Sequence, residues 1–343
     1  MKFIHISDIH LSDKLDFDSS NSKLIRKMKW DSFEKILKEN RDKDFLLISG
    51  DLFERDFFTL KDYQKLFEIL EDFPKDIYYL CGNHDYIDGK NEIFFSDKPD
   101  NLHIFSSDRI EFFEHNNVRI YGISYKDRIF DKRFNYNISL NHDYYNILIG
   151  HGVFNENNSS YMNLNLERIS NIGFDYVGLG HIHKKEKFSD KIFYVGSIEP
   201  MSFKDKGEFG YNLIDENGVK FINSSQMSFN TFDFDLNDFK SSEDFEKFLE
   251  KKLVKKYNFF TINVSNYDKF NISEKYLKDS LDLAYLKINY LRNQNYYKDL
   301  SKIYESTILG DFYQYFVDLD MDDPVNKRAL EIGFDAILRS KDE

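Results

Sequence analysis

Five short apolar runs in the first 185 residues each end in a cluster of aspartate, asparagine or histidine. The runs cover residues 3–6, 45–48, 77–80, 147–149 and 176–179. The clusters after them are Asp8-x-His10, Gly50-Asp51, Gly82-Asn83-His84-Asp85, Gly150-His151 and Gly180-His181-Ile182-His183. Apolar runs of this length are typical of buried strands, and ligands bind where the strands of α/β sheets end. The pattern predicts an α/β protein with a polar site at its strand ends.

The spacing within the clusters indicates a metal centre. Asp8 and His10 are two residues apart, which on extended backbone would point both side chains to the same side, and His181-x-His183 repeats this spacing. Asp51 and Asn83 add oxygen ligands, and carboxylate, amide and imidazole groups without thiolate suit Mn²⁺, Mg²⁺, Fe²⁺ or Zn²⁺. Seven donors are too many for one tetrahedral site but suit two ions that share a carboxylate, the usual arrangement for attack on phosphorus.

These five blocks, in this order, resemble the signature of the calcineurin-like metallophosphoesterase superfamily. The resemblance implies two divalent ions, with Mn²⁺ favoured. One ion would be held by Asp8, His10, Asp51 and His183, and the other by Asp51, Asn83, His151 and His181. Asp51 would be the bridging ligand.

The resemblance also implies two catalytic residues. His84 would orient the phosphodiester and protonate the leaving oxygen. Glu54 would support His84, or it would be a loop carboxylate that faces water. Arg55 could reach a phosphate, although an exposed loop arginine needs no such role.

A finer resemblance points to one branch of the superfamily, the SbcD-type nucleases of DNA double-strand-break repair. It rests on residues 3–11, 50–53, 174–183 and 194–203, the last of which contains no expected ligand. It implies a DNA exonuclease and endonuclease subunit, active in repair and recombination, that binds an SbcC-like SMC-type coiled-coil ATPase and forms a homodimer. Two alternatives stay open: a phosphodiesterase or phosphomonoesterase for a small phosphoester, and a non-catalytic protein-binding scaffold.

Composition agrees with a cytoplasmic enzyme. The single cysteine, Cys81, excludes disulfides within one chain, and no apolar run approaches the length of a membrane span. The net charge of −13 is unfavourable for DNA binding, which depends on cations that neutralise phosphates. Two divalent ions and local lysines, at 184–185, 251–252 and 255–256, could supply positive charge, although such lysines also occur on solvated helix faces.

Hydrophobic patterning predicts three segments. Residues 1–225 would form the catalytic domain, with a helix over 22–39, a capping box at Thr59 and Asp62, and two packed sheets flanked by helices. Residues 226–295 would form a smaller α/β capping domain, in which Ser242 caps a helix. Residues 296–343 would be helical, and the SbcD resemblance implies that these helices dock on the ATPase.

Overall fold

The computed structural model describes residues 1–339 apart from 14–18, 89–95, 131, 157, 267–268, 292–293 and 322. The chain divides into two compact units. The first comprises Met1–Phe229 with Val254–Asn258, and the second comprises Asn230–Leu253 with Phe259–Glu343. The expected division into three segments stays a prediction. Within the described ranges, every helix is too short or too polar to cross a membrane.

The first sheet of the first unit has six strands in the order β14-β13-β1-β2-β3-β4. Their bounds are β1 Phe3–Ile6, β2 Phe45–Ser49, β3 Asp76–Leu80, β4 Leu102–Phe105, β13 Gly210–Asp215 and β14 Gly218–Asn223. Strands β1 to β4 are parallel, and β13 joins β1 antiparallel. The carboxyl ends of β1, β2 and β3 therefore lie at one edge, where the first three polar clusters begin.

The second sheet also has six strands, in the order β11-β12-β10-β7-β6-β5. Their bounds are β5 Glu111–His115, β6 Val118–Gly122, β7 Tyr145–His151, β10 Tyr176–Gly180, β11 Glu186–Lys187 and β12 Ile192–Tyr194. Strands β7 and β10 are parallel neighbours, and Gly180 lies opposite His151. The last two polar clusters thus end adjacent strands. A two-stranded sheet of β8 (Val153–Phe154) and β9 (Asn163–Leu164) follows β7.

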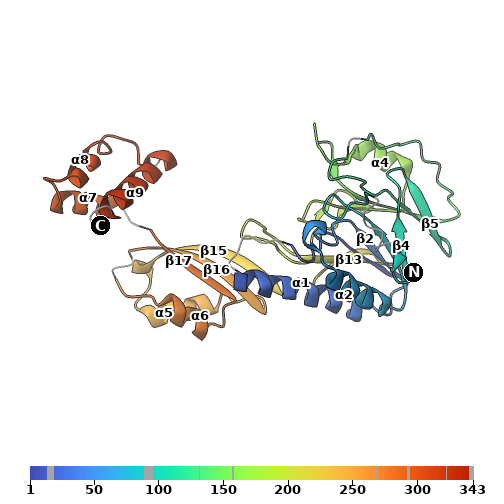
Figure 1. Cartoon of the computed structure of the whole chain (residues 1–343), viewed down its shortest axis with the longest axis horizontal. Coiled ribbons are helices and arrows are strands. Elements are labelled where there is room, and N and C mark those ends of the chain that lie inside the picture. Colours follow the sequence, from blue (N-terminus) through green and yellow to red (C-terminus); the bar gives the residue numbers. More distant parts are fainter. Residues whose placement is uncertain are drawn as a thin grey trace. The chain divides into compact units, whose positions relative to one another are not determined.

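The two sheets pack face to face, and helices cover their outer faces. Alternate residues of β1 divide between two cores: Phe3 contacts the second sheet, whereas Ile4 and Ile6 contact the helices. Helices α1 (Ser19–Glu39) and α2 (Leu60–Glu71) run along the first sheet (Figure 1). Helix α4 (Leu166–Ile172) packs on the second sheet through Ile169. This arrangement confirms the predicted α/β fold with two packed sheets.

Local sequence signals account for the helices of the first unit. The predicted helix over 22–39 is confirmed as α1, and the predicted capping box at Thr59 and Asp62 opens α2. A short 3-10 turn, Arg55–Phe57, lies between β2 and α2. Trp30 of α1 is buried in the core between this helix and the first sheet.

The second unit contains a sheet in the order β15-β16-β17 and two short helices. The bounds are β15 Met227–Asp235, β16 Tyr257–Ser265, β17 Tyr285–Tyr290, α5 Ser242–Glu250 and α6 Glu274–Ser280, with a 3-10 turn at Leu236–Asp238. The prediction that Ser242 caps α5 is wrong by one residue. The side chain of Ser241 accepts the hydrogen bond from the Asp244 backbone N–H, so Ser241 is the cap.

Three further helices follow: α7 (Gln294–Ile303), α8 (Ile308–Gln314) and α9 (Pro324–Arg339). They share a small core around Tyr297, Leu309, Leu330 and Phe334. Pro324 occupies the first helical position of α9, where its missing N–H needs no partner. Helix α7 begins two residues before the segment 296–343 that is predicted to be helical.

Candidate metal centre

The five polar clusters meet because their loops leave neighbouring strand ends of the two sheets. Residues 8–11 run beside residues 50–52: the Asp8 N–H donates to Gly50 O at 3.2 Å, and the His10 N–H donates to Asp51 O at 3.0 Å. The His181 backbone N–H in turn donates to the Asp8 carboxylate at 3.0 Å. Hydrogen bonds from backbone N–H groups, two to backbone oxygens and one to a carboxylate, therefore hold the loops of β1, β2 and β10 together.

The ligand loops have unusual backbone conformations. Asp8, His10, Asp51 and His181 have φ angles of 52°, 49°, 51° and 89°. The prediction that Asp8-x-His10 lies on extended backbone is therefore wrong. The left-handed conformation turns the chain back at each strand end, and residues with side chains usually avoid it. Such strain persists where surrounding contacts enforce it, and it is concentrated at functional sites.

The seven expected ligands lie together. Three sets of side chains have potential ligand atoms within 4.8 Å of one another: Asp8, His10 and His183; His10, Asp51 and His84; Asp51, His151 and His181. Asn83 Oδ1 lies 3.0 Å from His151 Nε2 and 3.2 Å from His181 Nδ1. Asp51 Oδ2 lies 3.1 Å from His151 Nε2 and 3.6 Å from His10 Nε2. Asp51 thus lies between two groups of ligands.

One imidazole provides a direct test of whether the cluster suits metal ions. His10 Nδ1 lies 2.5 Å from Glu54 Oε1, so the carboxylate accepts the Nδ1 proton. Nε2 of the same ring is buried and has no hydrogen-bond partner within the described ranges. A carboxylate on one nitrogen and a free lone pair on the other is the arrangement of a metal-ligating histidine. The residues therefore fit a centre for two divalent cations.

Glu54 contacts two histidines. Besides His10 Nδ1, its carboxylate accepts from His84 Nδ1 at 2.9 Å. Burial opposes ionisation of Glu54, but hydrogen bonds from His10 and His84 lower its pKa to about 2. Burial would likewise lower the pKa of His84, but the hydrogen bond to Glu54 and the charge of Asp51 raise it to about 9. The side chain of His84 is 36% exposed, so it borders the cluster where a substrate can reach it.

Asp85 ends the third cluster and had no predicted role. Its buried carboxylate accepts hydrogen bonds from four donors: the backbone N–H groups of Gly82, Asp51 and Leu52, and the Tyr79 hydroxyl. It therefore ties the loop that contains Asn83 and His84 to the loop that contains Asp51. The sequence signal for this role was the position of an acidic residue directly after Asn83 and His84.

Other polar residues lie away from the centre. His103 and His115 both contact Asp76, and His5 contacts Tyr176 between the two sheets. Arg55 pairs with Asp88 at 2.6 Å and donates to Tyr86 O at 2.9 Å. The side chain of Arg55 is 13% exposed, so it is not the exposed loop arginine of the expectation, and its contacts brace the loop after His84.

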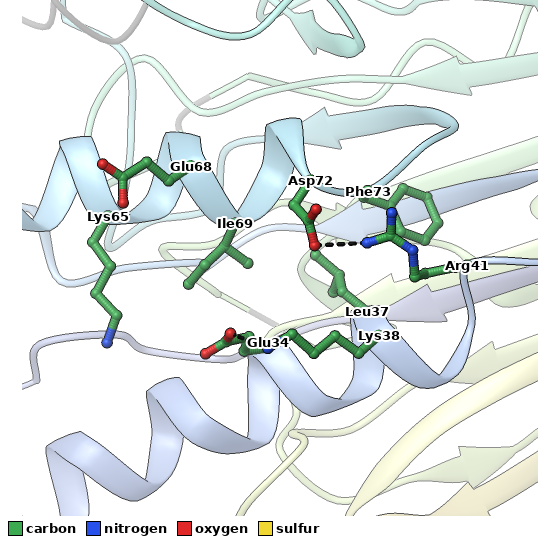
Figure 2. A pocket seen from close by; sticks show the side chains of 9 residues that line it. All are labelled: Glu34, Leu37, Lys38, Arg41, Lys65, Glu68, Ile69, Asp72 and Phe73. Atoms are coloured by element: carbon green, nitrogen blue, oxygen red, sulfur yellow. Dashed lines mark hydrogen bonds and ion pairs between the residues drawn. The ribbon is translucent and has the colours of Figure 1, made fainter.

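A cavity of about 270 Å³ lies between α1 and α2 (Figure 2). Apolar side chains line it together with three cations and three anions, and Arg41 pairs with Asp72 across it at 2.6 Å. None of the expected ligands lines this cavity. The side chains that can perform chemistry, rather than the size of a cavity, therefore locate the candidate site.

Comparison with known proteins identifies the family of this chain. The model of the family named calcineurin-like phosphoesterase matches residues 1–185. The chain is 28% identical over 235 residues to the uncharacterized metallophosphoesterase YhaO of Bacillus subtilis, a match that spans 62% of this chain and 57% of YhaO. Two solved structures are similar at TM-scores of 0.39 and 0.40: the protein TT1561 of Thermus thermophilus and a dimetal phosphatase from Danio rerio. They share 13% and 10% identity, cover 65% and 62% of this chain, and are themselves covered to 98% and 91%.

Proposed function

Because the chain belongs to the calcineurin-like phosphoesterase family, and is thus a metal-dependent phosphoesterase, we propose that it cleaves phosphodiester bonds in DNA. In this proposal it is the exonuclease and endonuclease subunit of an SbcCD-like repair complex and uses two Mn²⁺ ions. The proposal of two metal ions rests on the position of Asp51. This residue lies between two groups of ligands, which are Asp8, His10 and His183 on one side and Asn83, His151 and His181 on the other.

The residues around the ligands suit phosphodiester cleavage. When bound, two divalent cations lower the pKa of water and stabilise negative charge at phosphorus. Glu54 accepts from Nδ1 of His84, which leaves Nε2 of that partly exposed ring to meet the substrate. A proton on Nε2 can pass to the oxygen that leaves phosphorus. Glu54 also orients His10, so one carboxylate positions both a metal ligand and the proton donor.

DNA as the substrate is supported by the SbcD-like stretches and by basic residues in the turn between α5 and β16. Lys251, Lys252, Lys255 and Lys256 lie within six positions, and none forms an ion pair with a carboxylate of the described ranges. Lysines without a carboxylate partner are available to phosphates. The lysines would supply locally the positive charge that the whole chain lacks.

A small phosphoester is the second candidate, favoured by the net charge of −13. An assay of linear duplex DNA with Mn²⁺ separates the two. We expect Mn²⁺-dependent shortening of the duplex that EDTA abolishes and that falls steeply with added salt. Cleavage of bis-p-nitrophenyl phosphate without shortening of DNA would instead assign a small-substrate phosphodiesterase. Purified protein that binds no metal would support the third alternative, a non-catalytic protein-binding scaffold.

We also propose that the C-terminal helices bind the coiled coil of an SbcC-like ATPase in the cytoplasm and that the nuclease works as a homodimer. Helices α7 to α9 and the turns between them expose large apolar side chains, among them Ile303, Ile308, Tyr315 and Val325. Exposed apolar groups of this kind are common at protein interfaces. A pull-down from the native host, followed by nuclease assay with and without ATP, tests the partner.

A further inference from the structure

Lys29 is a buried lysine beside the metal centre. It lies on α1 with 1% of its surface exposed, and its ammonium group donates to the backbone oxygen of His10 at 3.3 Å. Asp13 Oδ2 lies 3.6 Å from the same ammonium group. Burial of an ammonium group is costly unless partners compensate for lost water. Both partners belong to the loop that contains Asp8 and His10, so α1 fixes this loop from behind.

The backbone of His183 has a comparable support. Its oxygen accepts from the Ser197 N–H at 2.9 Å. Gly196 has a φ of 79°, and a Cβ atom there would lie 2.7 Å from Lys185 N and 3.0 Å from His183 O. Only glycine at this position allows the two backbone segments to lie so close together. Residues 194–203, which contain no ligand, therefore support the loop that contains His183.

Glu199 connects this support to α1. The carboxylate is 2% exposed and accepts from the Ser32 hydroxyl on α1 at 2.5 Å. It also accepts from the Ser225 hydroxyl and from the backbone N–H groups of Gln226 and Met227 at 2.7, 2.7 and 3.1 Å. Ser32 lies three residues after Lys29, which places both on one face of the helix. One face of α1 thus contacts the supports of both His10 and His183.

The other imidazoles have different supports. His151 Nδ1 donates to Ser49 O at 2.9 Å, and its ring lies against Tyr125. The His181 ring lies 4.0 Å from the ring of Tyr161, measured between centroids. Neither support involves α1 or Glu199. The rings of His151 and His181 therefore have supports other than those that hold the backbones of His10 and His183.

We propose that Lys29 and Glu199 are positioning residues for one of the two metal sites, the site made by Asp8, His10 and His183. They act through the backbones of His10 and His183 and leave the site of Asn83, His151 and His181 unaffected. The inference rests on the two-metal centre of the proposed function.

The test titrates metal-free protein with Mn²⁺ and counts bound ions by calorimetry and mass spectrometry. Lys29→Met removes a positive charge and Glu199→Gln removes a negative charge. If these residues acted only through charge, the first change would strengthen cation binding and the second would weaken it. We expect both variants to weaken one Mn²⁺ site about 10- to 100-fold, the usual effect of removing an outer support, and to leave the other site at wild-type affinity.

Electron paramagnetic resonance provides an independent readout. Wild-type protein with two equivalents of Mn²⁺ should show the spectrum of a spin-coupled pair. With the same two equivalents of Mn²⁺, each variant should show the six-line spectrum of an isolated ion. Ser32→Ala, which removes one hydrogen bond to Glu199, should have a smaller effect in the same direction.

Lys38→Met and Glu71→Gln are matched controls, because both side chains are exposed on α1 and α2 and contact none of the supports. Fluorescence of Trp30, the single tryptophan, reports whether each variant is folded. Equal weakening of both sites in folded variants, or affinities that follow charge alone, would overturn the inference. Wild-type protein that binds fewer than two ions would instead contradict the proposed function.

Discussion

At the scale of single residues, one carboxylate connects metal binding to proton transfer. Glu54 lies 2.5 Å from His10 Nδ1 and 2.9 Å from His84 Nδ1. The two rings also contact each other edge to face, with centroids 4.9 Å apart. His84 is the more exposed of the two, and its role can therefore be separated from that of His10 by mutation.

We predict that His84→Ala retains both Mn²⁺ ions but lowers kcat about 100- to 10,000-fold, the usual contribution of a general acid. Calorimetric titration with Mn²⁺ and turnover of the same preparation measure the two effects. His103→Ala is the control, because His103 contacts Asp76 away from the cluster. Retained phosphodiester cleavage in the His84 variant would remove this histidine from the mechanism.

We predict a different result for Glu54→Gln, because its carboxylate also binds His10. This variant should lose turnover and also bind at least one Mn²⁺ ion about tenfold more weakly, since the amide cannot accept from both imidazoles. The same titration measures it. Unchanged metal affinity would restrict Glu54 to the support of His84.

At the scale of elements, β1 and β10 meet across the core between the sheets through a buried polar group. His5 Nδ1 on β1 lies 2.9 Å from the Tyr176 hydroxyl on β10, to which Asn212 also donates. Gly178 provides the room, since a Cβ atom there would lie 2.4 Å from the His5 ring. Burial lowers the pKa of His5 to about 3, so the ring stays neutral in the folded protein.

This contact predicts acid sensitivity of the first unit. Below pH 6.5 the unfolded chain protonates His5 and the folded chain does not, so the free energy of unfolding decreases as the pH decreases towards 3. Between pH 7 and 5, wild-type protein should lose about 2 kcal/mol relative to His5→Gln. Urea unfolding with excess chelator, followed by Trp30 fluorescence, measures this difference. If the free energy of unfolding of the two proteins changed equally with pH, His5 would not be neutral and buried in the folded protein.

At the scale of the whole molecule, the metal chemistry belongs to one unit. All seven expected ligands lie in the first unit, and the second unit has its own core of Leu236, Phe245, Phe260 and Ile262. Metal binding should therefore stabilise one unit alone, because a ligand shifts only the unfolding equilibrium of the part that binds it.

Scanning calorimetry should show two transitions, and Mn²⁺ should raise only the one that Trp30 fluorescence also reports. Free Mn²⁺ at 100 times its dissociation constant should add about 2.7 kcal/mol per site to the stability of the first unit. EDTA should reverse the change. A shift of both transitions together would mean that the two units unfold as one.

The fold class, several helices and the residues that gather at the centre were predicted from the amino-acid sequence alone. Helix periodicity in α1 and the capping box at Thr59 are local signals, readable from neighbours along the chain. The strand-end clusters converge because parallel strands end at the same edge of a sheet.

Only the folded structure shows which polar groups share a partner. Lys29 meets the backbone of His10 across 19 positions, and Glu199 meets Ser32 across 167. It also decided the left-handed backbone at Asp8 and His10, where extended chain was expected. Such features depend on how distant loops constrain one another, and local spacing along the chain contains no information about that constraint.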